Sequence, residues 1–227
     1  TDDGANGSDR TADAMLDQLM EGYWQRTLEA SPLMANAIGE YINTDDIDHV
    51  NDEAHEARRV VLKETLFSLK GIARDELSSR NQGHNDVFAN MLEQELADID
   101  LPTRFLGFST LGDWSSQFTA LVRSMPFRTL EDYENYIKRL SKFGRYADEN
   151  IALIRRGLEI GYVHPCDSIR GFGATIAATI KNSAEDSFAF GPVAKMPADF
   201  DEELATSIKK RIKDEIQNTV TPALERY

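Results

Sequence analysis

The clearest helical pattern in the sequence is MPFRTLEDYENYIKRLSKFGRYADENIALIRRGLEIGY, residues 125–162. Its apolar residues recur at steps of three and four, at Leu130, Tyr133, Ile137 and Leu140, and after Gly144 at Ala147, Ile151, Ile154, Leu158 and Tyr162. Such spacing places the apolar side chains on one face of a helix. We therefore predict two consecutive amphipathic helices that break near Gly144 and pack against each other as a hairpin.

Both ends of this segment carry helix-boundary signals. Thr129-Leu130-Glu131-Asp132 resembles a capping box, in which a Thr hydroxyl and an acid three residues later satisfy free amides at a helix start. The acid here is Asp rather than the usual Glu. His164-Pro165 is expected to end the second helix, because a residue before proline is pushed out of the α region.

The same periodicity extends to both sides of the segment. Helices are expected over residues 11–30, 51–73, 84–99, 113–124 and 168–182, and from about residue 199 or 201 onward, with a short helix begun by Ser31 and Pro32 and ended by Gly39. Asp113 is a candidate N-cap for the helix that reaches residue 124. Residues 43–48, 105–113 and 188–197 are expected to be connections. No useful run alternates apolar and polar residues, so we predict an all-α bundle of antiparallel helices and helical hairpins with no significant sheet.

The last expected helix has an unusual stripe. Leu204, Ile208, Ile212, Ile216 and Val220 follow one another at strict four-residue steps. Four residues of an α-helix advance about 400° rather than 360°. The stripe is therefore expected to drift around the helix, to cross its partners obliquely or to remain partly exposed.

Length and charge limit the classes of function. The chain has 227 residues and a net charge of −14, from 25 basic and 39 acidic residues. This excess opposes a nucleic-acid backbone and an anionic membrane surface, and no apolar run is long enough for a transmembrane segment. We expect a flexible acidic tether over residues 1–10, which opens with TDDGANGS, and a single all-helical domain over residues 11–227. There is no initiating Met or signal peptide, so we expect a targeting segment to have been removed.

Histidine and cysteine spacing assigns no catalytic, cofactor-binding or metal residue. The histidines are His49, His55, His84 and His164. A helical zinc site needs two histidines one turn apart, but HEARR places Arg59 where the second should be, so His55 is interpreted as an ordinary helix position. Cys166 and His164 lack a third group that would orient the base, and we interpret Cys166 as a small, semi-buried thiol beside a helix-ending His.

Other residue groups have simpler interpretations than a site. Neither Ser109 nor Ser115 lies in a GxSxG motif, and the glycines of residues 171–175 do not follow a strand. The basic run at residues 209–213 is attributed to ion pairs with neighbouring acids of the same helix. Trp24 and Trp114 are predicted core residues. Arg128, Tyr133 and His164 lie near helix breaks, where they could face a groove or equally serve as cap or packing residues.

Three segments together resemble a bacterial family called domain of unknown function 885. They are SPLMANAIGEY at residues 31–41, the block at residues 125–165, and the loop at residues 187–197. Within the block the resemblance is carried by Pro126, Phe127, Asp132, Tyr133, Tyr136, Leu140, Gly157, Gly161, Tyr162 and Pro165. It extends over nearly the whole chain from about residue 11.

The resemblance implies more than the residues themselves show. Members of this family are envelope proteins, often with a signal peptide or lipoprotein signal, so a periplasmic or lipid-anchored location is expected. They are more than twice as long, and their C-terminal half carries an HExxH-type helix and a downstream Glu, as in helical zinc metallopeptidases. The chain is then expected to be the N-terminal scaffold and cleft wall of such a protein, without activity alone. Zinc is implied only for the C-terminal half, and the implied partners are that half and peptides.

An alternative from a different class is an autonomous all-α binding or scaffolding module of the cell envelope. The last helix separates the two hypotheses. Exposed apolar surface on that helix, where the missing half would dock, favours the first hypothesis, and a fully packed helix favours the second. A thiol enzyme using Cys166 ranks far below both.

Overall fold

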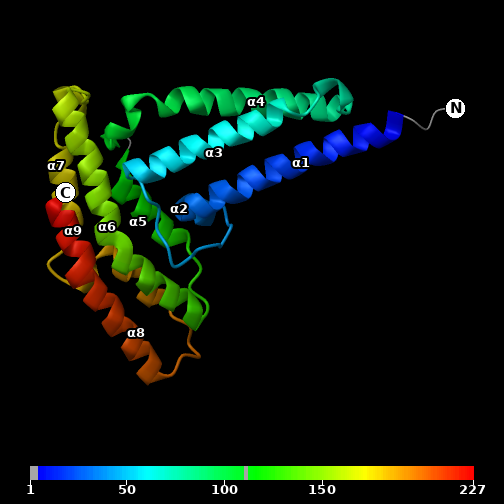
Figure 1. The fold of residues 1–227 in the computed structure, drawn as a ribbon. Helices are drawn as coiled ribbons and strands as arrows, with labels where there is room; N and C mark the ends of the chain where they lie inside the picture. The colour runs from blue at the N-terminus through cyan, green and yellow to red at the C-terminus, as the bar shows by residue number, and fades with distance from the viewer. Residues whose placement is uncertain (1–4, 110–111) are drawn as a thin grey trace. The chain divides into compact units, whose positions relative to one another are not determined.

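A computed structural model of the chain describes residues 5–109 and 112–227, with side chains from residue 11. Its helices are α1 (Ala5–Ala30), α2 (Pro32–Ala37), α3 (Asp52–Lys70), α4 (Ser79–Ile99), α5 (Trp114–Ser124), α6 (Leu130–Ile160), α7 (Phe172–Thr179), α8 (Glu202–Glu215) and α9 (Thr221–Arg226) (Figure 1). Strands β1 (Phe108–Ser109) and β2 (Gly112–Asp113) form a small antiparallel pair. The expected all-α bundle is confirmed. Within the described residues, no helix is both long and apolar enough to cross a membrane.

Shorter helical turns join these elements. The 3-10 helices are η1 (Arg74–Glu76), η2 (Pro102–Phe105), η3 (Cys166–Ile169), η4 (Ala184–Asp186) and η5 (Phe188–Lys195), and the π-helical turn is η6 (Ile216–Val220). The stretch expected as a connection at 188–197 is thus mostly η5. Helix α4 begins before the expected residue 84, because the Ser78 hydroxyl caps it by accepting from Asn81 N.

The contacts divide the chain into two compact units, where the sequence predicts one domain over residues 11–227. The N-terminal unit contains the chain up to Thr27 together with Asp52–Thr103, and the main unit contains Leu28–Asn51 and Arg104–Tyr227. Each has its own hydrophobic cluster, one built on α1, α3 and α4 and the other on α5, α6, α8 and α9. Of the expected tether, residues 1–4 lie outside the described residues and α1 begins at Ala5.

Helix α6 organises the main unit, and the predicted break at Gly144 is wrong. α6 is a single helix of 31 residues. A Cβ built on Gly144 would lie 3.5 Å from Thr219 Cγ2, so the glycine sits where η6 packs closely on α6 rather than at a turn. The predicted capping box is confirmed: Thr129 Oγ1 accepts from Asp132 N at 3.2 Å and Asp132 Oδ2 accepts from Thr129 N at 2.8 Å. The helix ends before His164-Pro165, at Gly161 in the left-handed region.

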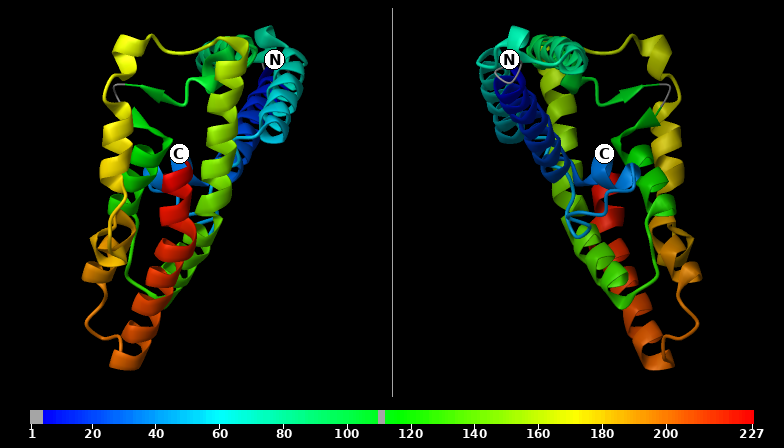
Figure 2. Two further views of the ribbon diagram at one scale, coloured as in Figure 1. Left: turned by 90° about the vertical axis from the view of Figure 1, so that its left-hand side faces the viewer. Right: turned by 90° about the vertical axis from the view of Figure 1, so that its right-hand side faces the viewer.

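The stripe of the last helix is buried over most of its length, so the expected partial exposure is found only at Leu204. Leu204 is half-buried, whereas Ile208, Ile212, Ile216 and Val220 are at most 1% exposed. The drift of a four-residue repeat is taken up by η6, because a π turn holds an additional residue and returns the stripe to the same face. As a result α8, η6 and α9 all pack along α6, as the two views of Figure 2 show.

The two glycines of α6 generate opposite predictions. Gly144→Ala should raise the free energy of unfolding by about 0.5–1 kcal/mol, because glycine is a poor helix residue and the new methyl group meets only ordinary contacts. Gly157→Ala is its control in the same helix. A Cβ built on Gly157 would lie 2.9 Å from Tyr162 O and 3.0 Å from Phe105 Cβ, so the substitution should lower the free energy of unfolding. Urea unfolding followed by circular dichroism measures both, and a stabilised Gly157→Ala variant would contradict this packing.

Candidate functional site

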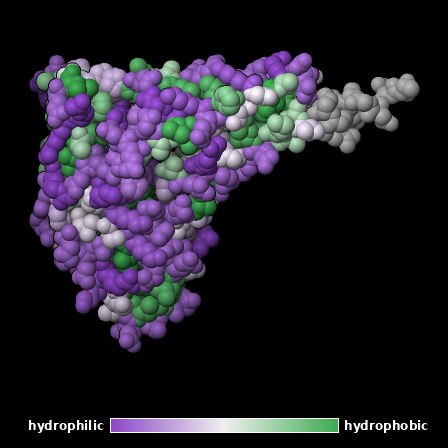
Figure 3. Space-filling view, in the orientation of Figure 1, coloured by the Kyte–Doolittle hydropathy of each residue, from purple (hydrophilic) through white to green (hydrophobic). Residues whose placement is uncertain are grey.

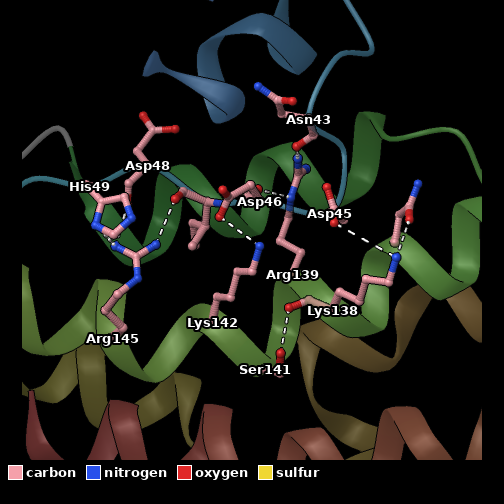
Figure 4. A network of polar contacts seen from close by, with 12 residues as sticks. Asn43, Asp45, Asp46, Asp48, His49, Lys138, Arg139, Ser141, Lys142 and Arg145 are labelled. Carbon is pink, nitrogen blue, oxygen red and sulfur yellow. Dashed lines mark hydrogen bonds and ion pairs between the residues drawn. The ribbon is translucent and has the colours of Figure 1, made fainter. Parts of the chain in front are cut away.

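A buried guanidinium fixes the connection between α2 and α3 on α6. The side chain of Arg139 is fully buried. Its Nε donates to Asp46 O at 2.6 Å and its Nη2 to Asn43 O at 3.0 Å (Figure 4). Burial lowers the pKa of Arg139 to about 10, although the nearby carboxylates of Asp48, Asp46 and Asp45 act in the opposite direction. We call residues 43–50 with Arg139, Lys142, Arg145 and Glu149 the polar clamp.

The rest of the polar clamp follows α6 for two further turns. Arg145 Nη2 donates to Ile47 O at 2.8 Å, and Glu149 Oε2 accepts from Val50 N at 2.8 Å. Arg145 Nη1 lies 2.7 Å from His49 Nδ1 (Figure 4), and the same ring nitrogen lies 3.2 Å from Glu149 Oε1. These contacts hold the connection in place on α6.

Asp48 ties a third element to the polar clamp. Its Oδ1 accepts from Leu33 N in the first turn of α2 at 2.9 Å. Burial raises the pKa of this carboxyl group, against the lowering effects of the Leu33 hydrogen bond and of Arg139. The polar clamp is therefore interpreted as a network that stabilises α2 and the connection, rather than as a catalytic centre.

The histidines flagged in the sequence are not brought together. In the N-terminal unit His55 Nε2 lies 3.0 Å from Ile99 O, and Arg59 pairs with Glu56 and Asp100. His84 is half-buried on α4, also in that unit. Among the described residues no group of three or more His, Cys, Asp or Glu side chains could hold a metal ion.

The prediction of a semi-buried Cys166 is wrong, because Cys166 is an exposed free thiol in η3. His164 packs its ring 5.9 Å from that of Phe108, and its Nε2 is buried without a hydrogen-bond partner among the described residues. Ser115 Oγ donates to Asp113 Oδ2 at 2.7 Å. Asp113 is the N-cap of α5, as predicted. Ser109 lies in β1.

Several other flagged residues serve packing. Tyr133 is buried, and its hydroxyl donates to Pro192 O at 3.1 Å. Burial raises the pKa of that hydroxyl to about 12. Arg128 is exposed at the start of α6. Trp114 is a core residue as predicted, but Trp24 is 40% exposed because it lies on the outer face of α1.

The basic run at residues 209–213 pairs differently from the prediction. Arg211 forms a two-pronged contact with Glu134 of α6, and Lys213 pairs with Glu185 of η4. Acids of the same helix are not the partners. Tertiary packing brought residues 77 positions apart into contact, which no local pattern could indicate.

An apolar groove of about 450 Å³ lies in the main unit between α6, α7 and the end of α9. Its walls are Ile151, Ile154 and Leu158 of α6 and Phe172, Ile176 and Ala177 of α7. Phe108 of β1 stacks on Phe172 at a centroid distance of 4.7 Å, and Leu224 of α9 also lines the groove. Figure 2 shows α6 and α7 diverging with α9 between them. This volume lies in the range of small-molecule sites.

The glycines of residues 171–175 shape one wall of this groove. Gly171 has φ 84° and directly precedes α7, and Gly173 lines the groove. A left-handed residue at this position favours glycine. The prediction that these glycines permit close packing is wrong, because a Cβ built on Gly171 or Gly173 would meet no atom within 4 Å. The sequence also gave no indication of a groove.

Two charged side chains of the groove, those of Arg155 and Glu225, are without a partner among the described residues. Helix α6 contains four arginines, and three of them bind acceptors: Arg139, Arg145 and Arg156. Arg155 lines the groove and makes no ion pair or hydrogen bond with another described residue. Leu158, one turn further on, is 64% exposed although it is apolar. Elsewhere the face of the molecule in Figure 3 is mainly hydrophilic with separate hydrophobic patches.

Comparison with known proteins identifies similar sequences and folds. The model of a family described as "Bacterial protein of unknown function (DUF885)" matches residues 32–227. No curated protein sequence matches the chain. A solved structure described as "the putative lipoprotein from Colwellia psychrerythraea" is similar, with a TM-score of 0.78 at 15% identity. The match covers 96% of this chain and 40% of that one, so the chain spans about two fifths of the solved protein's length.

The buried guanidinium generates a stability prediction. Arg139→Met should lower the free energy of unfolding by about 2 kcal/mol or more, because it leaves buried carbonyl oxygens of the connection without donors. Lys138→Met is the matched control, since Lys138 is exposed and its nearest acid, Asp45, is 3.9 Å away. Urea unfolding compares the two. Equal effects would show that the polar clamp contributes little.

Glu149 makes part of this stability depend on pH. Burial raises its pKa, but the hydrogen bonds from Val50 N and Arg145 outweigh burial, so the pKa of Glu149 is lowered. A lowered carboxyl pKa stabilises the folded state above the unfolded value of about 4.3, and that contribution is lost as pH falls through the folded value. Glu149→Gln should therefore be less stable than the native chain at pH 7 and should approach it at pH 3. A constant difference in unfolding free energy across this range would contradict the assignment.

Proposed function

We propose that this chain, which belongs to the bacterial DUF885 family, is the helical scaffold and cleft-wall region of a longer peptidase-like protein of the cell envelope. The observation that carries the proposal is the apolar groove on the main unit, which opens between α6 and α7. A groove bounded by rigid helices is suited to line one side of a binding cleft. The resemblance to DUF885 found in the sequence is confirmed by the family match.

The relation to a longer protein supports the scaffold role. Nearly all of this chain matches two fifths of a solved protein described as a lipoprotein. The remaining part of such a protein is the proposed partner, and peptides are the proposed substrate class. An envelope location fits the same description.

The described residues do not fit the zinc that the resemblance implies. They contain no set of metal ligands, and the HEARR segment places the ion-paired Arg59 at the position of the second histidine. A guanidinium there would repel the metal. We therefore derive no metal-dependent step for this chain, and zinc is proposed to bind outside it.

One observation favours the alternative, an autonomous binding module of the envelope. The stripe of α8 and η6, which a docking partner would be expected to cover, is already buried against α6. In this second function the groove would bind its ligand without a further part of the protein. The two functions differ in whether the chain acts alone.

Two neighbouring alanines of α7 provide the test. Ala177 lines the groove and Ala178 does not, and both are exposed. In the full-length protein, Ala177→Asp should lower kcat/KM for peptide hydrolysis by about tenfold or more with zinc content unchanged, because it places a charge among apolar groups. Ala178→Asp should leave hydrolysis unchanged.

Equal activity of the two variants would reject the cleft-wall role. The 227-residue chain alone should neither cleave peptides nor bind stoichiometric zinc, as measured by elemental analysis. Peptide binding by this chain without hydrolysis, lost in Ala177→Asp, would instead favour the autonomous module.

A further inference from the structure

We propose that the groove binds a single-chain carboxylate, a fatty-acid-type amphiphile, with its hydrocarbon chain on the apolar lining and its carboxylate on Arg155. The inference rests on the proposed function in one respect, namely that the groove is a ligand-binding surface. It adds the chemical class of the ligand. Three features of the groove support it: the nature of its walls, the unpaired guanidinium and the exposed apolar residue beside it.

The apolar side chains of the groove wall suit a hydrocarbon chain. On α6 the wall is the interior of a helix, where the backbone groups of Ile151 and Ile154 are hydrogen-bonded within the helix. Any amide group that a ligand buried on Ile154, Leu158 and Ile176 would lack a partner from these side chains, at about 1–3 kcal/mol for each unsatisfied group. A hydrocarbon chain carries no such groups and gains from covering the exposed Leu158.

Arg155 supplies the charge that selects an anionic head group. It lies on the same α6 stripe as Ile151 and Leu158 and lines the groove with them. It has no acceptor among the described residues, in a chain whose net charge is −14. A carboxylate matches the planar, two-pronged geometry of a guanidinium.

The other charged residues of the rim are weaker candidates. Arg226 is already engaged, because its Nε donates to Asp148 Oδ1 at 2.8 Å. Glu225 is an exposed carboxylate that would repel an anion placed next to it and attract a cation. A cationic amphiphile is therefore the competing ligand that the experiment must distinguish.

The experiment measures binding of matched amphiphiles to the 227-residue chain by isothermal titration calorimetry. The probes are dodecanoate, dodecanol and dodecyltrimethylammonium, each below its micelle concentration. We expect dodecanoate to bind most tightly. Arg155→Gln should weaken dodecanoate by about tenfold or more and leave dodecanol unchanged, because only the charge-assisted contact is lost.

Arg156 provides the matched control for Arg155. It is the next residue, is exposed, pairs with Glu159 and does not line the groove, so Arg156→Gln should leave dodecanoate binding unchanged. Ala177→Asp should abolish binding of both dodecanoate and dodecanol, and Ala178→Asp should not.

Several outcomes would overturn the inference. They are no binding of dodecanoate, tighter binding of the trimethylammonium probe, or an equal loss in the Arg155 and Arg156 variants. If dodecanoate fails to bind while Ala177→Asp still lowers peptide hydrolysis, the ligand class is wrong and the cleft-wall role stands. If dodecanoate binds as expected while Ala177→Asp leaves hydrolysis unchanged, the cleft-wall role is wrong and the ligand class stands.

Discussion

A buried guanidinium must have acceptors, and this constraint holds the main unit together. The unit is built from two pieces of chain, Leu28–Asn51 and Arg104–Tyr227. Arg139 satisfies its donors with backbone carbonyls of residues 43 and 46, so the first piece is pinned to the longest helix of the second. These two carbonyls can accept from Arg139 only when the connection between α2 and α3 adopts this conformation. The polar clamp therefore selects one conformation of the connection and also stabilises it.

Helix α6 packs against different elements along its length. Its first part packs against α8, η6 and α9, whose isoleucine stripe stays aligned because the π turn absorbs the drift of the four-residue repeat. Further along α6, Leu224 of α9 and the residues of α7 line the groove beside it. The exposed Leu158 and the unpaired Arg155 of α6 lie in this groove.

Features that depend on neighbouring residues, such as helix caps, could be predicted from the sequence. Features that depend on distant partners, such as ion pairs between helices, could not. Asp113 and Thr129 were found as helix caps because a cap binds amides within three residues of itself. Gly144 was misread as a break, because a glycine at a turn and a glycine beneath a crossing segment look alike in sequence. Arg211 was assigned to acids of its own helix, although Glu134 of α6 is its partner. The groove needed three elements far apart in the chain, so no single window contained it.

The sequence by itself determined that this protein is helical, where most of its helices begin, and that it belongs to DUF885. These properties follow from apolar spacing, capping residues and motif residues, all of which are local or linear. Only the tertiary structure decided that two units form, that most of the last stripe is buried, and that Arg155, unlike the other α6 arginines, has no acceptor among the described residues. The physical reason is that burial and pairing depend on which helices pack together, and side-chain periodicity does not specify the partner.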